Sequence, residues 1–204
     1  PTMIIQAYAA IMYGDIIMLL SNQTRPYEIN KGDTDKLVEK WIDEIANRFK
    51  KNKGYFGKHL KENFNAISDD FASLKANRIP KIKVGIVGEI YMKYSKLGNS
   101  DLEVFLRNED VEIMIPPLNS FILYGLYNKK MDNIYYGRSP VASYSMEKIV
   151  LPILKRFETW LEDAIKRHPE FAVPAKFEEL IAYGKRFINL GCKMGEGWLL
   201  TAEM

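Results

Sequence analysis

Helical spacing of apolar residues dominates this 204-residue sequence and most restricts how it can fold. From Met3 to Leu74, apolar side chains recur every three or four positions, which is the spacing of one face of an α-helix. The pattern predicts an all-helical segment over residues 1–76. Its expected parts are helices at about 4–20, 34–50 and 56–74, a connecting loop at 22–31, and Asp33 as the N-cap of the second helix.

The pattern changes after Pro80, where two short runs of β-branched residues predict strands. The first run, 82–87, ends at Gly88, and the second, 111–115, is stopped by a pair of prolines. Residues between the two runs have helical spacing, so the three elements form a predicted βαβ unit with parallel strands and a right-handed crossover. The helix between the strands is expected at about 100–108, and later helices are expected at about 121–127, 144–167 and 175–190, with a loop at 128–140.

We therefore expect an α/β fold that is predominantly helical and contains a small parallel Rossmann-like sheet, the βαβ unit at about 82–115. Residues 80–204 form a Rossmann-like segment that packs with the helical segment 1–76 into one domain of a larger protein. Two strands alone seldom make a stable sheet, and the chain ends at Met204 within an apolar, helix-like run. Both observations predict an excised, truncated piece whose missing strands lie outside this sequence.

Composition limits the kinds of site that the chain can build alone. Lys and Arg total 29 against 26 acidic residues, and an excess of +3 is too small to indicate a nucleic-acid partner. The single cysteine, Cys192, excludes an internal disulfide and a cysteine-rich metal or iron–sulfur site. The two histidines, His59 and His168, lie in different segments and do not favour a zinc site.

The most apolar segment is Met3–Leu20, which Gln6, Gly14 and Asp15 interrupt. A membrane span needs about 20 nearly uninterrupted apolar residues, so we interpret this segment as a buried helix. Low cysteine usage and the lack of a basic-then-apolar leader predict a cytoplasmic protein with no membrane partner.

The end of the first predicted strand offers one candidate site. Ligands of open parallel sheets bind beyond the carboxyl ends of the strands, and glycines there allow a close approach of the backbone. Gly85, Gly88 and Glu89 are therefore candidate cleft-lining residues. The segment lacks both the G-x-G-x-x-G fingerprint and the Gly-Lys-Ser/Thr of a P-loop. The alternative is that the glycines serve packing and that Glu89 is solvated.

A second candidate precedes the apolar C-terminal run, where a glycine-rich turn leads into a predicted helix. Such a turn presents backbone N–H groups that suit an anion or a polar ligand, although a simple loop has the same composition. Its candidate cleft-lining residues are Gly195, Glu196, Gly197 and Trp198.

Arg25, Cys192 and the remaining polar residues give weaker indications. Arg25 precedes a proline turn and is a candidate anion-binding residue, unless it only bridges a loop to a helix. Cys192 beside Lys193 is interpreted as a free structural thiol, because no histidine base can be assigned to it. We assign no catalytic residue and no metal ligand.

Together, several of these motifs resemble one family. The segments that carry the resemblance are Thr24–Glu28 with Lys31-Gly32, Pro80–Tyr91, Gly98–Leu102, Val111–Pro117 and Gly195–Met204. In this order they are similar to the activase-related region of the large CoA-substrate-specific enzyme activases. That region is itself similar to subunits of 2-hydroxyacyl-CoA dehydratases such as the 2-hydroxyglutaryl-CoA enzyme.

The resemblance implies a role in anaerobic metabolism. In this family an ATP-hydrolysing activase with an iron–sulfur cluster passes a low-potential electron to a dehydratase component. ATP, the cluster and an acyl-CoA are thus implied for the parent protein, whereas this chain has neither the nucleotide loop nor the cluster cysteines. The implied partners are neighbouring activase or dehydratase domains and a second copy paired through the sheet edge.

Two other functions stay open from the residues alone. The helical segment 1–76 is suited to a non-catalytic docking or assembly module. A small-molecule enzyme with Glu89 as general base is the third reading, although no partner acid or nucleophile can be named.

Overall fold

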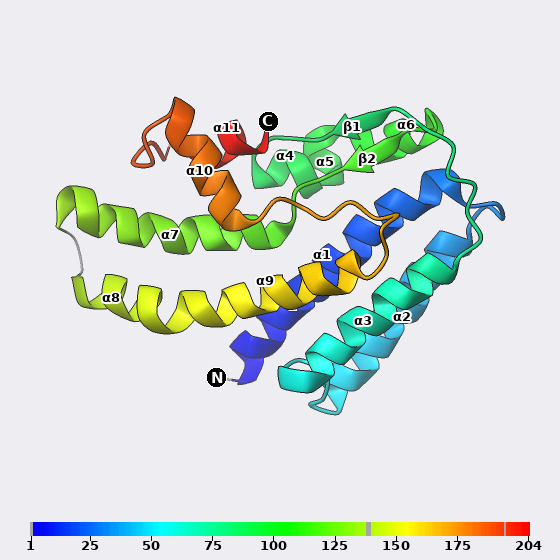
Figure 1. Cartoon of the computed structure of the whole chain (residues 1–204), viewed down its shortest axis with the longest axis horizontal. Helices are drawn as coiled ribbons and strands as arrows, with labels where there is room; N and C mark the ends of the chain where they lie inside the picture. The colour runs from blue at the N-terminus through cyan, green and yellow to red at the C-terminus, as the bar shows by residue number, and fades with distance from the viewer. Residues whose placement is uncertain (1, 138–139, 194) are drawn as a thin grey trace. The chain divides into compact units, whose positions relative to one another are not determined.

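The computed structural model describes residues 2–137, 140–193 and 195–204 (Figure 1). Contacts between residues divide the chain into two compact units. Unit 1 comprises residues 1–85, 102–115 and 159–173, and unit 2 comprises residues 86–101, 116–158 and 174–204. The predicted segment 1–76 therefore lies within unit 1, while the predicted segment 80–204 contributes to both units.

Unit 1 begins with the helices that the apolar spacing predicts. They are α1 (Thr2–Thr24), the short 3₁₀ helix η1 (Arg25–Tyr27), α2 (Asp33–Lys50) and α3 (Gly57–Ser73). Part of the predicted loop 22–31 is thus helical, because α1 continues to Thr24 and η1 follows directly.

The start of α2 differs from its prediction. Asp33 is the first residue of α2, and Gly32 precedes it with φ +92°. The carboxylate of Glu28 accepts hydrogen bonds from the backbone N–H groups of Gly32 and Thr34, both at 2.8 Å. Glu28 therefore satisfies the free N–H groups at this helix start, a role that we expected of Asp33.

The strands β1 (Lys83–Gly85) and β2 (Glu112–Met114) pair in parallel, with Lys83 opposite Glu112. The parallel pair and a helix content of 70% confirm the predominantly helical α/β fold. Both strands are shorter than predicted.

Glu112 joins three segments of unit 1, because Tyr27 donates a hydrogen bond to it at 2.6 Å and Lys83 forms an ion pair with it at 2.9 Å.

Between the strands the chain forms three short helices in place of one. They are α4 (Ile90–Tyr94), α5 (Lys96–Asn99) and α6 (Leu102–Asn108). Of these, α6 belongs to unit 1 and the other two belong to unit 2.

Most of α1 supports the prediction of a buried helix. The side chains of Met12, Ile16 and Leu20 are buried, but Met3 and Ile4 at its beginning are 77% and 71% exposed. Residues 3–27 are long and apolar enough to cross a membrane. Because a buried core helix has the same length and composition, this finding does not assign a location.

Unit 2 consists of helices. Besides α4 and α5 they are α7 (Leu118–Tyr136), α8 (Pro140–Ser145), a π-helical turn (Met146–Val150), the first part of α9 (Leu151–Lys166), α10 (Phe177–Phe187) and α11 (Gly197–Glu203).

The predicted loop at 128–140 is wrong, because α7 continues to Tyr136. Tyr124 and Met131 are both buried, which extends the helical spacing through this polar stretch, and the helix ends at Gly137 with φ +63°.

An aromatic group forms the centre of the unit 2 core. The ring of Trp198 lies 5.2 Å from Tyr124, 5.9 Å from Phe177 and 6.1 Å from Tyr127, measured between centroids. Aliphatic side chains complete the cluster: Leu123, Met131, Leu151, Leu180, Leu190 and Leu199. The C-terminal motif therefore contributes its largest residue to packing.

Replacing Phe64 by Ala tests the unit 1 core. Phe64 is fully buried and packs edge-on against Tyr13 at 5.3 Å, so its truncation leaves a cavity. We expect the variant to lose about 3–5 kcal/mol of unfolding free energy in urea titrations. Phe56, which is 56% exposed, gives the matched control, and Phe56→Ala should change stability by about 0.5 kcal/mol at most. Equal losses in both variants would contradict this core.

Candidate functional site

A buried polar cluster of unit 2 joins two distant parts of the sequence. The backbone N–H of Ile90 donates a hydrogen bond to the carboxylate of Glu196. The Nζ of Lys93 lies 3.2 Å from Glu196 Oε2 and 3.1 Å from Glu203 Oε2. The beginning of α4 is therefore held to both ends of the C-terminal motif, and we call Lys93, Glu196 and Glu203 the buried ion cluster.

Water hardly reaches the buried ion cluster. The side chains of Lys93, Glu196 and Glu203 are 1%, 4% and 2% exposed. Charges are buried this deeply only when they are paired, because desolvation costs several kcal/mol per ion. One ammonium faces two carboxylates, and Glu203 Oε1 has no hydrogen-bond partner among the described residues. The cluster therefore holds one more negative charge than it can neutralise.

This imbalance acts on Glu203. Burial raises the pKa of its carboxyl above the ordinary value of 4.5, the positive charge of Lys93 opposes that rise, and the negative charge of Glu196 adds to it. The carboxyl of Glu203 therefore takes up a proton at a higher pH than an ordinary glutamate does.

Two glycines allow Glu196 to turn inward. Gly195 has φ +58°, and a Cβ there would collide with the carboxylate of Glu89. Gly197 has φ +41°, and its Cβ would collide with the carbonyl oxygen of Cys192. Both positions therefore need glycine for their conformation, and Gly197 needs it for space as well, because the atom that its Cβ would meet belongs to the backbone. The Gly-Glu-Gly spacing thus serves the turn itself.

The structure brings Glu89 and Gly195, two of the predicted site residues, close together. Glu89 is exposed and lies beside Gly195, while Glu196 is buried. Gly88 lies near Met92 in unit 2, whereas Gly85 ends β1 in unit 1.

Contrary to its prediction as a cleft-lining residue, Trp198 has no exposed surface. The helix α11 turns its indole toward α7 and α10, where Tyr124 and Phe177 lie, and its Nε1 donates to Asn128 Oδ1 at 3.3 Å. Burial of a large aromatic ring outweighs display of the motif at the surface.

Arg25 in unit 1 bridges the turn at η1 to helix α2. This was the alternative to its prediction as an anion-binding residue. Its Nε and Nη2 lie 3.0 and 2.8 Å from Asp35 Oδ1, and its Nη1 lies 3.2 Å from Asn22 Oδ1. It also lines a cavity of about 310 Å³ together with Lys31 and Arg107. Burial, and next the like charge of Arg25, hold the pKa of Arg107 below its usual range.

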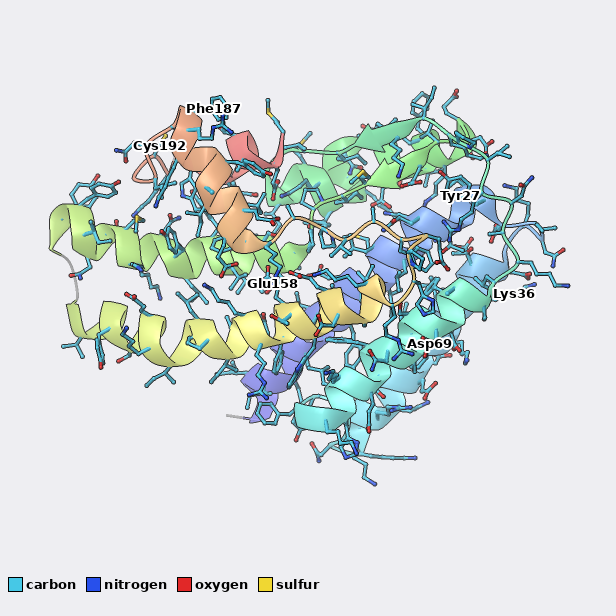
Figure 2. All side chains as sticks on the ribbon, viewed as in Figure 1. Tyr27, Lys36, Asp69, Glu158, Phe187 and Cys192 are labelled. Carbon is cyan, nitrogen blue, oxygen red and sulfur yellow. The ribbon has the colours of Figure 1, made fainter. Side chains whose placement is uncertain are left out.

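Cys192 and the histidines show no arrangement for catalysis or metal binding. Cys192 is a half-buried free thiol on the loop between α10 and α11 (Figure 2). The neighbouring Lys193 pairs with Asp132. His168 Nε2 lies 2.8 Å from Asp69 Oδ1, and His59 is exposed. Within residues 2–137, 140–193 and 195–204, no three His, Cys, Asp or Glu side chains gather as a metal site.

Sequence reasoning missed Lys93, Glu203 and Arg107. A lysine inside the apolar and aromatic run Ile90–Tyr94 was the one available signal of a buried charge. Glu203 and Arg107 gave no such signal, because the charges of Lys93 and Arg25 that act on them come from positions far away in the sequence.

Comparison of the chain with protein-family models, with curated proteins and with solved structures finds no significant match.

Replacing Lys93 by Met removes the only cation of the buried ion cluster. Glu196 and Glu203 would then remain buried without a counter-charge, and we expect a loss of about 3–5 kcal/mol of unfolding free energy at pH 8. Lys193→Met is the matched control, because it breaks a partly exposed pair with Asp132 and should cost about 1 kcal/mol or less. Urea unfolding of both variants checks the difference, and equal costs would contradict the cluster.

The raised pKa of Glu203 predicts a pH dependence of stability. The folded protein binds this proton more tightly than the unfolded chain, so the contribution of Glu203 to stability is greatest below pH 4.5. It declines as the pH rises toward the pKa of the folded state and then levels off. Glu203→Gln should remove this decline. Urea unfolding of the parent and the variant between pH 4.5 and 8 measures it, and parallel curves would contradict the prediction.

Proposed function

We propose that this chain is a supporting domain of a CoA-substrate-specific enzyme activase or 2-hydroxyacyl-CoA dehydratase-like protein. In this proposal it has a Rossmann-like sheet and supports ATP-driven, low-potential electron transfer for acyl-CoA dehydration, without a complete catalytic site of its own. One observation carries the proposal. The motif segments Pro80–Tyr91 and Gly195–Met204 meet at the part of the first segment that lies in unit 2, residues 86–91, where Glu196 accepts a hydrogen bond from Ile90.

Internal contacts support a structural role for the motif residues. General acid–base chemistry needs a group that a substrate can reach, with a partner within hydrogen-bond distance. Glu196 and Glu203 are buried against Lys93, and Arg25 is held by Asp35. Glu89 is exposed to solvent and a substrate can reach it, so its role as a general base stays a prediction.

The residues of this chain do not fit the iron–sulfur cluster that the resemblance implies for the parent protein. Such clusters are bound by several cysteine thiolates, usually four. The chain has one cysteine, a half-buried thiol on the loop between α10 and α11. The proposal therefore assigns cluster binding and ATP hydrolysis to other parts of the parent, and it includes a cytoplasmic location.

A docking module is the second candidate function. The first turn of α1 exposes Met3, Ile4 and Ile5, and clustered apolar side chains on a surface often mark an interaction site. In this role the helical segment 1–76 binds a neighbouring activase or dehydratase component.

Anaerobic purification of the complete gene product that contains this sequence tests the proposal. We expect that product to contain iron and sulfide, to absorb visible light as an iron–sulfur protein, and to hydrolyse ATP. The chain alone, purified in the same way, should do none of these. A complete product that lacks both the cluster and the ATPase activity would overturn the family assignment.

Glu89→Gln in the complete product provides the control for chemistry within this chain. A supporting role predicts that its activity stays within about twofold of the parent, since Glu89 contacts no reacting group. A loss of about a hundredfold or more, with folding intact, would support the general-base reading instead.

A further inference from the structure

One end of unit 1 exposes apolar side chains to water. Figure 1 shows the start of α1, the end of α2 and the start of α3 together at this end. Met3, Ile4 and Ile5 of α1 are exposed, and so is Phe56, the residue before α3. None of the four belongs to the core of unit 1, and exposed apolar side chains that gather in this way mark an interaction surface.

Lysines lie directly beside these apolar side chains. Gln6 Nε2 donates a hydrogen bond to Asn52 Oδ1 at 3.1 Å. Met3–Ile5 immediately precede Gln6, and Lys51 and Lys53 flank Asn52, so this bond holds the first turn of α1 next to both lysines. Further exposed lysines at the same end are Lys50, Lys58 and Lys61.

The charge of this end stays positive when its acidic residues are counted. Residues 43–62 contain six Lys or Arg and three acidic residues, an excess of +3, and the first turn of α1 contains no acidic residue. Glu44 pairs with Arg48 and Glu62 with Lys58, while Asp43 lies about two turns before the end of α2. The lysines that no described residue pairs are Lys50, Lys51, Lys53 and Lys61.

We infer that this end of unit 1 binds the surface of an anionic lipid bilayer. Met3, Ile4 and Phe56 enter the boundary between head groups and acyl chains, and the lysine ammonium groups contact the lipid phosphates. Charge and apolar exposure together select this occupant, because a soluble polyanion would satisfy the lysines but leave the aliphatic side chains in water.

A peripheral contact of this kind leaves the core of unit 1 intact. Met12, Ile16 and Leu20 of α1 stay buried, and only the first turn of the helix meets the lipid. The inference revises the expectation of no membrane partner, which depended on the lack of a spanning segment and of a leader. It does not rest on the proposed function.

Co-sedimentation of the whole chain with sucrose-loaded vesicles tests the inference. In about 0.1 M NaCl, vesicles of phosphatidylcholine with about one third phosphatidylserine should bind the chain. Each lysine near the surface strengthens binding by roughly fivefold, so vesicles of phosphatidylcholine alone should bind at least about a hundredfold more weakly. Raising NaCl to about 0.5 M should weaken binding to the anionic vesicles by about tenfold or more.

Two variants separate the basic part of the surface from its apolar part. Lys51→Gln combined with Lys53→Gln should weaken binding to the anionic vesicles by about thirtyfold. Ile4→Ser should weaken it by about tenfold or more, because less apolar area enters the bilayer. All three side chains are exposed, so both variants should fold as the parent does.

Matched controls make the same changes at the other end of unit 1. Lys36 near the start of α2 (Figure 2) and Lys75 after α3 are exposed, so Lys36→Gln combined with Lys75→Gln removes the same charge. Ile29 is 61% exposed, and its backbone N–H donates a hydrogen bond to the carbonyl of Lys75, so Ile29→Ser is the control for Ile4→Ser. Both controls should bind as the parent does.

Three results would overturn the inference. They are no sedimentation with the anionic vesicles, equal sedimentation with the neutral ones, and test variants that bind like their controls. In the first case the surface would be left to a protein partner, as in the docking role of segment 1–76.

Discussion

Burial of Lys93 is the constraint on which the arrangement of unit 2 most depends. An ammonium with 1% of its side chain exposed is tolerated only because Glu196 and Glu203 reach it from the C-terminal motif. This requirement holds α4 to the turn before α11, and the turn in turn needs glycine at positions 195 and 197. The same turn places Trp198 in the aromatic core. The ion pairs of Lys93 and the packing of Trp198 therefore depend on the same turn.

Buried carboxylates have a comparable task in unit 1. Glu28 satisfies the first N–H groups of α2, and Glu112 joins the strand pair to Tyr27 and Lys83. In each unit a buried acidic side chain closes a junction between segments, where backbone groups or cations would otherwise lie buried without partners. Such residues stabilise the structure, and their presence alone is no sign of catalysis.

The supporting role depends on a resemblance, and two of the segments that carry it meet in unit 2 through Glu196 and Ile90.

The sequence by itself determined the elements that a local apolar pattern specifies. These were the three helices of segment 1–76, the parallel strand pair and the helical majority of the chain, because periodicity reports which face of an element is buried. The length of α7 was missed, since the polar residues after Tyr127 resemble a loop until Met131 is seen in the core.

Only the tertiary structure decided the capping role of Glu28, the burial of Trp198 and the partners of Lys93. The partners of Lys93 lie more than 100 residues away in the sequence. The energy of a buried charge depends on which groups surround it in space. The local spacing of residues along the chain does not identify those groups.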